Sequence, residues 1–257
     1  TAYHILVASS PELLEQGKGD IWDSGKIESD ASQWITYQGK TLKCNASYYW
    51  KVKIDTNKGA TNWSAPAFWT TGLFNEADWQ GQWIGLDKAA PGDSETQWSR
   101  LAARYLRKEF AVKKSVKRAT VHIAGMGLYE LFINGQRIGN QVLAPAPTDY
   151  RKTILYNTYD VTSLLQTENA IGVTLGNGRF YTMRQNYKPY KIPTFGYPKL
   201  RLNLIVEYAD GSKETIATNT SWKLTTEGPI RSNNEYDGEE YDARKELGDW
   251  TQTGYDD

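Results

Sequence analysis

The sequence predicts an all-β protein made of two consecutive β-sandwiches. Apolar and polar residues alternate in short runs separated by turn residues along most of the 257 residues, as expected for antiparallel strands. No stretch keeps the 3.6-residue apolar period of a long helix. Trp 10 and Tyr 17 supply large side chains for the cores, because each aromatic residue buries much apolar area.

Residues 1–72 are predicted to form the first domain. Its strand-like runs are AYHILVAS, YYWKVKIDTNKG and NWSAPAFWTTG, and WDSGKI marks a turn. These pieces resemble a fibronectin type III-like domain, with Trp50 as an aromatic residue on the inner face of the sandwich. The first strand of that family would lie before Thr1, so the resemblance implies a truncated domain.

Residues 73–102 are predicted to connect the two domains. We expect Trp79 and Trp83 to fix this connector onto a sandwich face. The following run, KAAPGDSETQWSR, is polar and contains Pro and Gly, which predicts a loop or linker.

Residues 103–257 contain about eight further strand-like runs with long connections, a pattern typical of a jelly-roll sandwich. Asn134-Gly135 and Asp210-Gly211 predict two-residue hairpin turns, because these residue types accept positive φ. The only helical prediction is DVTSLLQTEN, with Asp160 or Thr162 as its N-cap.

Composition excludes several classes of function. Lys+Arg 30 balance Asp+Glu 30, so no net field attracts nucleic acid or an anionic membrane. No apolar run is long enough to span a bilayer. Cys44 is the single cysteine and excludes an internal disulfide. The chain starts without Met or a signal peptide, from which we expect a fragment or a processed product.

The motifs ELFINGQRIG, TDYRKTILYNTYDVT, LGNG and DGEEYDAR occur together and in order in the second block. With these motifs the block resembles the amino-terminal domain of bacterial α-L-rhamnosidases, and the first block and connector are similar to the same family. The resemblance implies a carbohydrate-binding-module-like jelly-roll and a catalytic α/α barrel downstream, outside this chain. It also implies a glycosidase parent that is periplasmic or extracellular in a bacterium.

Three functions remain open. The first is a non-catalytic part of an α-L-rhamnosidase that supports and docks the missing barrel, with no cofactor required. The second is an autonomous module that binds L-rhamnose or a rhamnose-containing carbohydrate. The third is a purely structural spacer.

The acidic cluster Asp237, Glu239, Glu240 and Asp242 is the best local candidate for glycoside hydrolysis, which needs two carboxyl groups across one sugar. Neighbouring residues of an extended segment point to opposite faces, so Glu239 and Glu240 do not easily flank one bond. We therefore expect a solvated turn or a docking segment. Tyr241, Ala243 and Trp250 alternate with charges there, and a docking face predicts an exposed apolar patch around Tyr241 and Trp250.

A sugar site is predicted on loops of the second block. Its substrate-binding residues would be Asp149, Tyr150, Asn177, Arg179 and Phe180. The resemblance implies that some members of the family bind L-rhamnose with the help of calcium, whose ligands here would be Asp149, Asn177 and Asp237. Relatives often carry Trp where this sequence has Arg179, so Phe180 or Tyr181 would supply the stacking ring.

Each of these residues also has a purely structural interpretation. Asp149 can cap a turn, and Asn177 can occupy the left-handed corner of its Gly-Asn-Gly run. His4 and His122 lack partners at metal-ligand spacing, so we expect them to be core or surface histidines.

Overall fold

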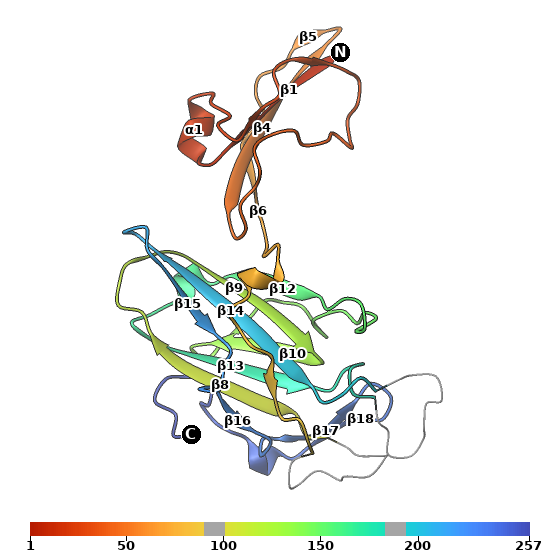
Figure 1. Ribbon diagram of the computed structural model, residues 1–257, viewed down its shortest axis with the longest axis vertical. Helices are drawn as coiled ribbons and strands as arrows, with labels where there is room; N and C mark the ends of the chain where they lie inside the picture. The colour runs from red at the N-terminus through yellow and green to blue at the C-terminus, as the bar shows by residue number, and fades with distance from the viewer. Residues whose placement is uncertain (90–100, 183–193) are drawn as a thin grey trace. The chain divides into compact units, whose positions relative to one another are not determined.

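The computed structural model describes residues 1–89, 101–182 and 194–257. The chain divides into two compact units, Thr1–Asp78 and Trp79–Asp257, and both are built from antiparallel sheets (Figure 1). The all-β prediction is therefore confirmed. Most of the polar loop predicted at 88–100 lies outside the described residues.

The first unit contains one six-stranded sheet. Its strands are β1 (Ala2–Ala8), β2 (Trp22–Asp23), β3 (Ile27–Glu28), β4 (Ser47–Thr56), β5 (Gly59–Ala60) and β6 (Ala67–Thr70). Strands β1 and β4 pair along their lengths, from Ala2 opposite Asp55 to Ala8 opposite Tyr49. The short strands β2 and β3 pair with β1, and β5 and β6 pair with β4.

A two-sheet sandwich was predicted for this unit, but its described strands form a single sheet. Ile5 and Val7 pack on one face with the irregular segment that carries Ile35 and Leu42. Leu6 and Ala8 pack on the other face with Leu14, which lies in the short helix α1 (Pro11–Glu15). A loop and one helix thus cover the faces that a second sheet would otherwise cover.

Helix α1 was not predicted from the sequence. Ser10 is its N-cap, and the Ser10 hydroxyl accepts a hydrogen bond from the Leu13 amide at 3.3 Å. Pro11 at the first helical position completes a recognised start signal.

The second unit is a sandwich of two five-stranded sheets. One sheet has the order β11-β10-β13-β8-β16, and the other has the order β12-β9-β14-β15 with β7 beside β14. The strands are β7 (Ile84–Gly85), β8 (Arg104–Ala111), β9 (Val116–Met126), β10 (Leu128–Ile133), β11 (Gln136–Ile138), β12 (Tyr156–Asp160), β13 (Glu168–Gly176), β14 (Lys199–Tyr208), β15 (Lys213–Ala217) and β16 (Lys223–Thr225).

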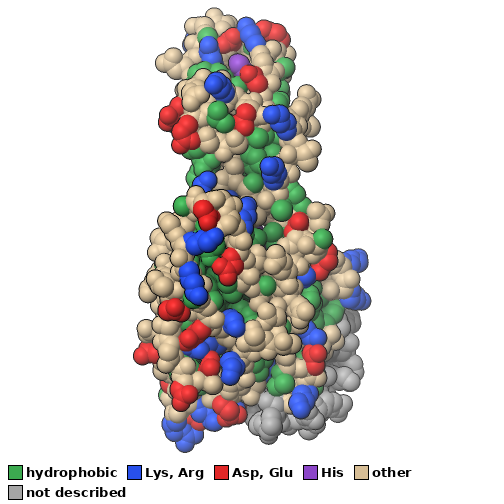
Figure 2. Space-filling view, turned by 60° about the vertical axis from the view of Figure 1, so that its left-hand side comes forward, with side chains coloured by type: hydrophobic (Ala, Val, Ile, Leu, Met, Phe, Trp, Pro, Cys, Tyr) green, Lys and Arg blue, Asp and Glu red, His purple; other side chains and the backbone are tan. Residues whose placement is uncertain are grey.

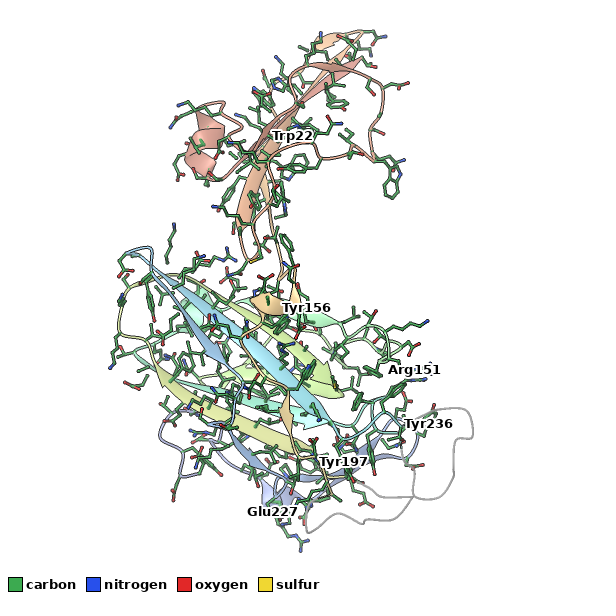
Figure 3. All side chains as sticks on the ribbon, in the orientation of Figure 1. Trp22, Arg151, Tyr156, Tyr197, Glu227 and Tyr236 are labelled. Carbon is green, nitrogen blue, oxygen red and sulfur yellow. The ribbon has the colours of Figure 1, made fainter. Side chains whose placement is uncertain are left out.

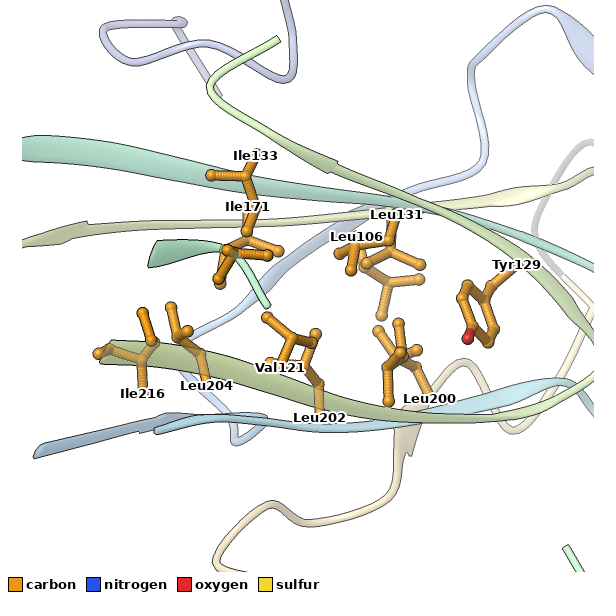
Figure 4. Packing of buried hydrophobic residues seen from close by; sticks show 14 of the residues in the cluster. Leu106, Val121, Tyr129, Leu131, Ile133, Ile171, Leu200, Leu202, Leu204 and Ile216 are labelled. Carbon is orange, nitrogen blue, oxygen red and sulfur yellow. The ribbon is translucent and has the colours of Figure 1, made fainter. Parts of the chain in front are cut away.

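The core of this unit lies between the two sheets. Leu131 and Ile171 from one sheet and Leu202 from the other belong to a single buried cluster (Figure 4). Fully burying such a side chain contributes roughly 1.5–3 kcal/mol. Alternate residues of each strand reach this layer, as the predicted two-residue period requires.

Two hairpins test the predicted turns. Asn134 and Gly135 have φ of 50° and 81° and join β10 to β11 directly, which confirms the first turn. The second connection is a four-residue loop, because β14 ends at Tyr208 and β15 begins at Lys213. The predicted two-residue turn is therefore wrong, although Gly211 does have a positive φ of 83°.

The helix predicted at residues 160–169 is reduced to one 3₁₀ turn, η2 (Thr162–Leu164). Neither predicted N-cap is correct, because the N-cap position is Val161. Val161 is fully buried. The chain enters the extended strand β13 at Glu168, so only one helical turn is formed before it.

The remaining elements are η1 (Glu76–Asp78), the hairpin of β17 (Ile230–Asn234) and β18 (Gly238–Tyr241), and η3 (Ala243–Lys245). No described helix is long and apolar enough to cross a membrane. On the face shown in Figure 2, basic and acidic side chains are interspersed.

Candidate functional site

Two residues of the predicted sugar site are brought together in an aromatic cluster of the second unit. The ring of Tyr150 lies edge-on to that of Phe180, with 5.3 Å between centroids. Phe195 completes the cluster, 5.3 Å from Tyr150 and stacked at 5.9 Å on Phe180. The three residues come from the loop before β12, the segment after β13 and the segment before β14. Phe195 was missed because nothing local places its segment beside the other two.

The Tyr150 hydroxyl is the unusual atom of this cluster. It is buried and has no hydrogen-bond partner in the part of the chain that the structure describes. Burial raises the pKa of Tyr150, and the carboxylate of Glu235 raises it further while Arg179 opposes the shift. The Tyr150 hydroxyl therefore stays protonated at neutral pH.

Arg179 and Asp149 are both engaged in ion pairs. Arg179 Nε lies 3.0 Å from Glu235 Oε2. Asp149 Oδ1 accepts from Arg151 Nε at 2.9 Å, and its Oδ2 accepts from Arg151 Nη2 at 3.3 Å. The Arg151 side chain holds the pKa of Asp149 below its usual range. Figure 3 labels Arg151 and Tyr236 on the same side of the second unit.

Asn177 is a buried structural residue. Its Nδ2 donates to the Asn233 carbonyl at 2.8 Å and to the Leu101 carbonyl at 3.2 Å. Its Oδ1 is buried without a hydrogen-bond partner among the described residues. The predicted left-handed corner is wrong for Asn177, because the positive φ, 49°, belongs to Gly178.

The three predicted calcium ligands lie on separate loops. Asp237 belongs to the β17–β18 turn, where its amide donates to Asn234 Oδ1 at 3.3 Å. Asn177 follows β13, and Asp149 precedes β12. Within residues 1–89, 101–182 and 194–257, no group of three His, Cys, Asp or Glu residues is arranged to hold a metal ion.

In the acidic cluster, the side chains of Glu239 and Glu240 point to opposite faces of one extended strand. Glu239 and Glu240 are successive exposed residues of β18, opposite Asn233 and Ser232. Asp242 caps η3 by accepting from the Arg244 amide. The Arg244 guanidinium lowers the pKa of Asp242 to about 2, which suits a structural anion.

Trp250 does not belong to an exposed patch, so that part of the predicted docking face is wrong. Its ring lies edge-on to Tyr105 and Phe132, at 5.4 and 6.2 Å, on the outer face of the β8–β10 sheet. A Cβ added at Gly172 would lie 3.0 Å from the Trp250 ring. Tyr241, in contrast, is 53 % exposed.

The two histidines have structural roles, and Trp79 is fixed as predicted. His122 is fully buried, and its Nδ1 lies 3.0 Å from the Thr158 hydroxyl. The ring of Trp79 packs edge-on against His122 and Tyr156. His4 pairs with Asp23 at 2.6 Å.

Comparison with protein families identifies both units. Residues 114–257 match the model of the alpha-L-rhamnosidase N-terminal domain. Residues 1–75 match the Rha78A-like, N-terminal immunoglobulin domain. The first unit is therefore immunoglobulin-like, and the fibronectin type III-like fold predicted from the sequence has a related architecture.

Individual relatives agree with this assignment. An alpha-L-rhamnosidase of Formosa agariphila is 41% identical over 100% of this chain and 29% of its own length. One of Alteromonas sp. (strain LOR) is 36% identical over 100% of this chain and 28% of its own.

Solved structures show the same relation. The alpha-L-rhamnosidase from Dictyoglumus thermophilum has a TM-score of 0.89 at 42% identity and is matched over 100% of this chain and 29% of its own. The alpha-L-rhamnosidase from Aspergillus terreus has a TM-score of 0.85 at 33% identity, and the match covers 99% of this chain and 28% of that protein. The chain thus spans less than a third of the length of each of these four relatives, and it belongs to the α-L-rhamnosidase N-terminal domain family.

Proposed function

We propose that this chain is the non-catalytic β-sheet part of an α-L-rhamnosidase and that its second unit docks a catalytic α/α barrel of the same protein. The whole chain matches relatives named alpha-L-rhamnosidase, and about 71% of the length of the first of these lies outside the match. A domain that occurs within a larger enzyme needs a surface for the rest of that enzyme.

The ionisation of the carboxyl groups supports a non-catalytic role. A general acid for glycoside hydrolysis needs a raised pKa. Among the described carboxyl groups, every pKa that departs from its ordinary value is lowered. Asp149, Glu227 and Asp242 are examples, and in each the main cause is a hydrogen bond from a basic side chain.

The observation that carries the docking role is the exposure of β18. All four residues of this strand are exposed, and in the described chain it pairs only with β17. Tyr241 at its end presents an amphipathic ring, and Glu239 and Glu240 give the strand negative charge. An open strand with one aromatic and two acidic residues suits a partner surface with basic groups and a hydrogen-bonding edge.

Two measurements test this proposal. The chain alone is expected not to hydrolyse an aryl α-L-rhamnoside, and turnover by the purified chain would refute the non-catalytic assignment. In the whole protein, Tyr241→Arg is expected to separate thermal unfolding into two transitions. Val142→Arg is the matched control, because Val142 is more exposed, at 79 %, but lies outside β18. Equal effects of the two variants would remove β18 as the docking surface.

A second candidate function is L-rhamnose binding at the Tyr150–Phe180–Phe195 cluster. It is favoured by the buried Tyr150 hydroxyl without a partner, because such a group gains a hydrogen bond when a ligand hydroxyl arrives. Arg179 would donate from the side, and Asp149 and Asn177 would accept. The stacking ring predicted at Phe180 or Tyr181 is not part of this proposal, because both residues are only 7% exposed.

Calcium belongs to this second proposal. The Asn177 Oδ1 atom fits a calcium ligand, since it is a buried amide oxygen without a hydrogen-bond partner among the described residues. Asp149 fits less well, because Arg151 contacts both of its carboxylate oxygens, and Asp237 would have to approach from the β17–β18 turn. A bound ion would supply only a positive charge for sugar hydroxyls.

Calorimetric titration with L-rhamnose, with and without calcium, tests both ideas. Tyr150→Phe and Asp149→Ala are expected to weaken binding. Tyr255→Phe is the control, because it keeps the ring that lies over the Arg107 guanidinium. Absence of saturation in every titration would leave docking as the only proposed function.

A periplasmic or extracellular location is part of the main proposal, and fractionation of the native bacterium tests it.

A further inference from the structure

We infer that the first unit carries a separate binding site for a neutral pyranose sugar, with Trp34 as its stacking surface. The site lies in the immunoglobulin-like unit, whereas the aromatic cluster belongs to the second unit. It stands independently of the proposed docking function.

The site is a hollow of about 520 Å³ beside the short strands β2 and β3. Pockets of this size accommodate small ligands. Three aromatic and several uncharged polar side chains surround it, and its lining residues are Tyr3, Trp22, Asp23, Ser24, Ile27, Ala31, Trp34, Ile35, Thr36 and Gln38. Figure 3 labels Trp22 next to the β1–β4 sheet.

Trp34 is placed as a surface for a ligand and contributes little to the fold. It is 92 % exposed, and in the described part of the chain no ring or cation contacts its indole. Its φ is 60°, a conformation that is strained for a bulky residue. The neighbouring Ile35, in contrast, packs against the apolar cluster of the sheet. An exposed and strained aromatic residue points to a function other than packing.

The segment that carries Trp34 is anchored on its C-terminal side. The Lys40 amide donates to the Ile21 carbonyl at 2.9 Å, and the Tyr37 hydroxyl donates to the Lys40 carbonyl at 2.5 Å. The rings of Trp22 and Tyr37 meet edge-on at 5.3 Å. A Cβ at Gly39 would lie 2.6 Å from the Cβ of Trp22, so only glycine allows this close approach. The hollow is therefore preformed, which lowers the cost of binding.

The polar side of the hollow selects the charge of the ligand. Asp23 Oδ1 is held by His4 Nε2 at 2.6 Å and by the Gly25 amide at 2.9 Å. The Gly25 hydrogen bond is the main cause of the lowered pKa of Asp23, so this carboxylate is ionised at neutral pH. Among the described residues, no Lys or Arg lines the hollow. A uronate or a phosphate would thus meet the Asp23 carboxylate with no Lys or Arg to offset the repulsion.

A neutral sugar ring matches both sides of the hollow. Pyranoses present a face of C–H groups that packs on an indole, and their hydroxyl groups donate to a carboxylate such as Asp23. Thr36 and Gln38 can both donate and accept. A purely apolar ligand would leave these polar groups without partners.

Two-dimensional NMR of the ¹⁵N-labelled chain tests the inference through the indole N–H signal of Trp34. The probes are methyl α-L-rhamnopyranoside, methyl β-D-galactopyranoside and methyl β-D-glucopyranoside. At least one neutral glycoside is expected to shift this signal to saturation at millimolar concentration, whereas methyl α-D-galacturonide is not. Choline serves as a probe for a cationic ligand.

Matched variants separate the site from surface effects. Trp34→Ala, followed through the amide signals of Ser24 and Gln38, is expected to weaken binding about tenfold or more. Phe68→Ala, which removes another exposed aromatic ring of the same unit (68 % exposed) outside the hollow, is expected to leave binding unchanged.

Three outcomes would overturn the inference: no saturable shift with any neutral glycoside, binding that survives Trp34→Ala, or a response to choline alone. None of them affects the hydrolysis and unfolding measurements that test the docking function.

Discussion

Arg107 Nη1 lies 2.6 Å from Asp257 Oδ2, although 150 residues separate the two in sequence. Arg107 also donates from Nε to the Trp250 carbonyl at 2.7 Å and from Nη2 to the Gln252 carbonyl at 2.6 Å. Glu109 accepts from the same guanidinium. Arg107 is only 5% exposed, so one buried cation holds residues 249–257, the tail, on the outer face of the β8–β10 sheet.

Replacing Arg107 is expected to release the tail. Arg107→Ala removes the donors of two backbone carbonyls and the counterion of two carboxylates, and we expect a loss of roughly 2–4 kcal/mol of unfolding free energy. Urea denaturation measures the loss, and faster hydrogen exchange at the Gly254 amide, which donates to Glu109, reports the release. Arg244→Ala is the control, because its side chain is 89% exposed, and a change under about 0.5 kcal/mol is expected. Equal losses would contradict the role of Arg107.

Gly172 is expected to be required for the packing of the tail. A Cβ at this position would lie 2.6 Å from Thr251 Cγ2 and 3.0 Å from the Trp250 ring, so Gly172→Ala should destabilise the chain by roughly 1–3 kcal/mol through overpacking. Combined with Arg107→Ala, its effect should shrink, because the tail is already released. Strictly additive losses in the double-mutant cycle would show that the tail is not the coupled element.

His122 is expected to make stability depend on pH. Burial, aided by Arg118, lowers its pKa in the folded chain to about 4, below the value of about 6.5 expected in the unfolded chain. The unfolded chain therefore binds a proton first, and stability that is complete above pH 6.5 is lost as the pH falls toward about 4, by up to about 3 kcal/mol.

The matched variant for His122 is His122→Gln, which is expected to flatten the decline of stability between pH 7 and 4. Urea denaturation as a function of pH measures the slope, and an NMR titration of the imidazole gives its pKa directly. An imidazole that titrates near pH 6.5 in the folded chain would contradict the prediction.

Trp34 is expected to reduce stability through its backbone conformation. Because its φ is 60°, Trp34→Gly should be more stable than Trp34→Ala by roughly 1 kcal/mol, the reverse of the usual order of these residues at ordinary φ. Chemical denaturation of the two variants gives the difference. A more stable Ala variant would mean that the segment does not hold this φ in solution.

Most strands, the order of the two units and the family could be predicted from patterns in the sequence. Alternation sets which side chains share a face, and Asn134 with Gly135 sets a turn, because both effects act between neighbours in the chain. Asn134 also shows the limit of this reasoning: its side chain bonds the Leu164 carbonyl, Asn169 Oδ1 and the Ala170 amide, partners that no local pattern announces.

What covers each apolar face follows from long-range contacts. The strand-like runs of residues 1–72 predicted a sandwich of two sheets, but a loop and helix α1 cover the faces of one sheet. The alternation of Tyr241, Ala243 and Trp250 with charges predicted an exposed Trp250, but the buried Arg107 bonds the Trp250 carbonyl and holds that residue on the sheet. The motifs of the second block suggested Tyr150 and Phe180 for the sugar site and missed Phe195. The physical reason is common to all three: burial and charge pairing join residues far apart in the chain, and a sequence pattern records the period of a strand without naming its partner.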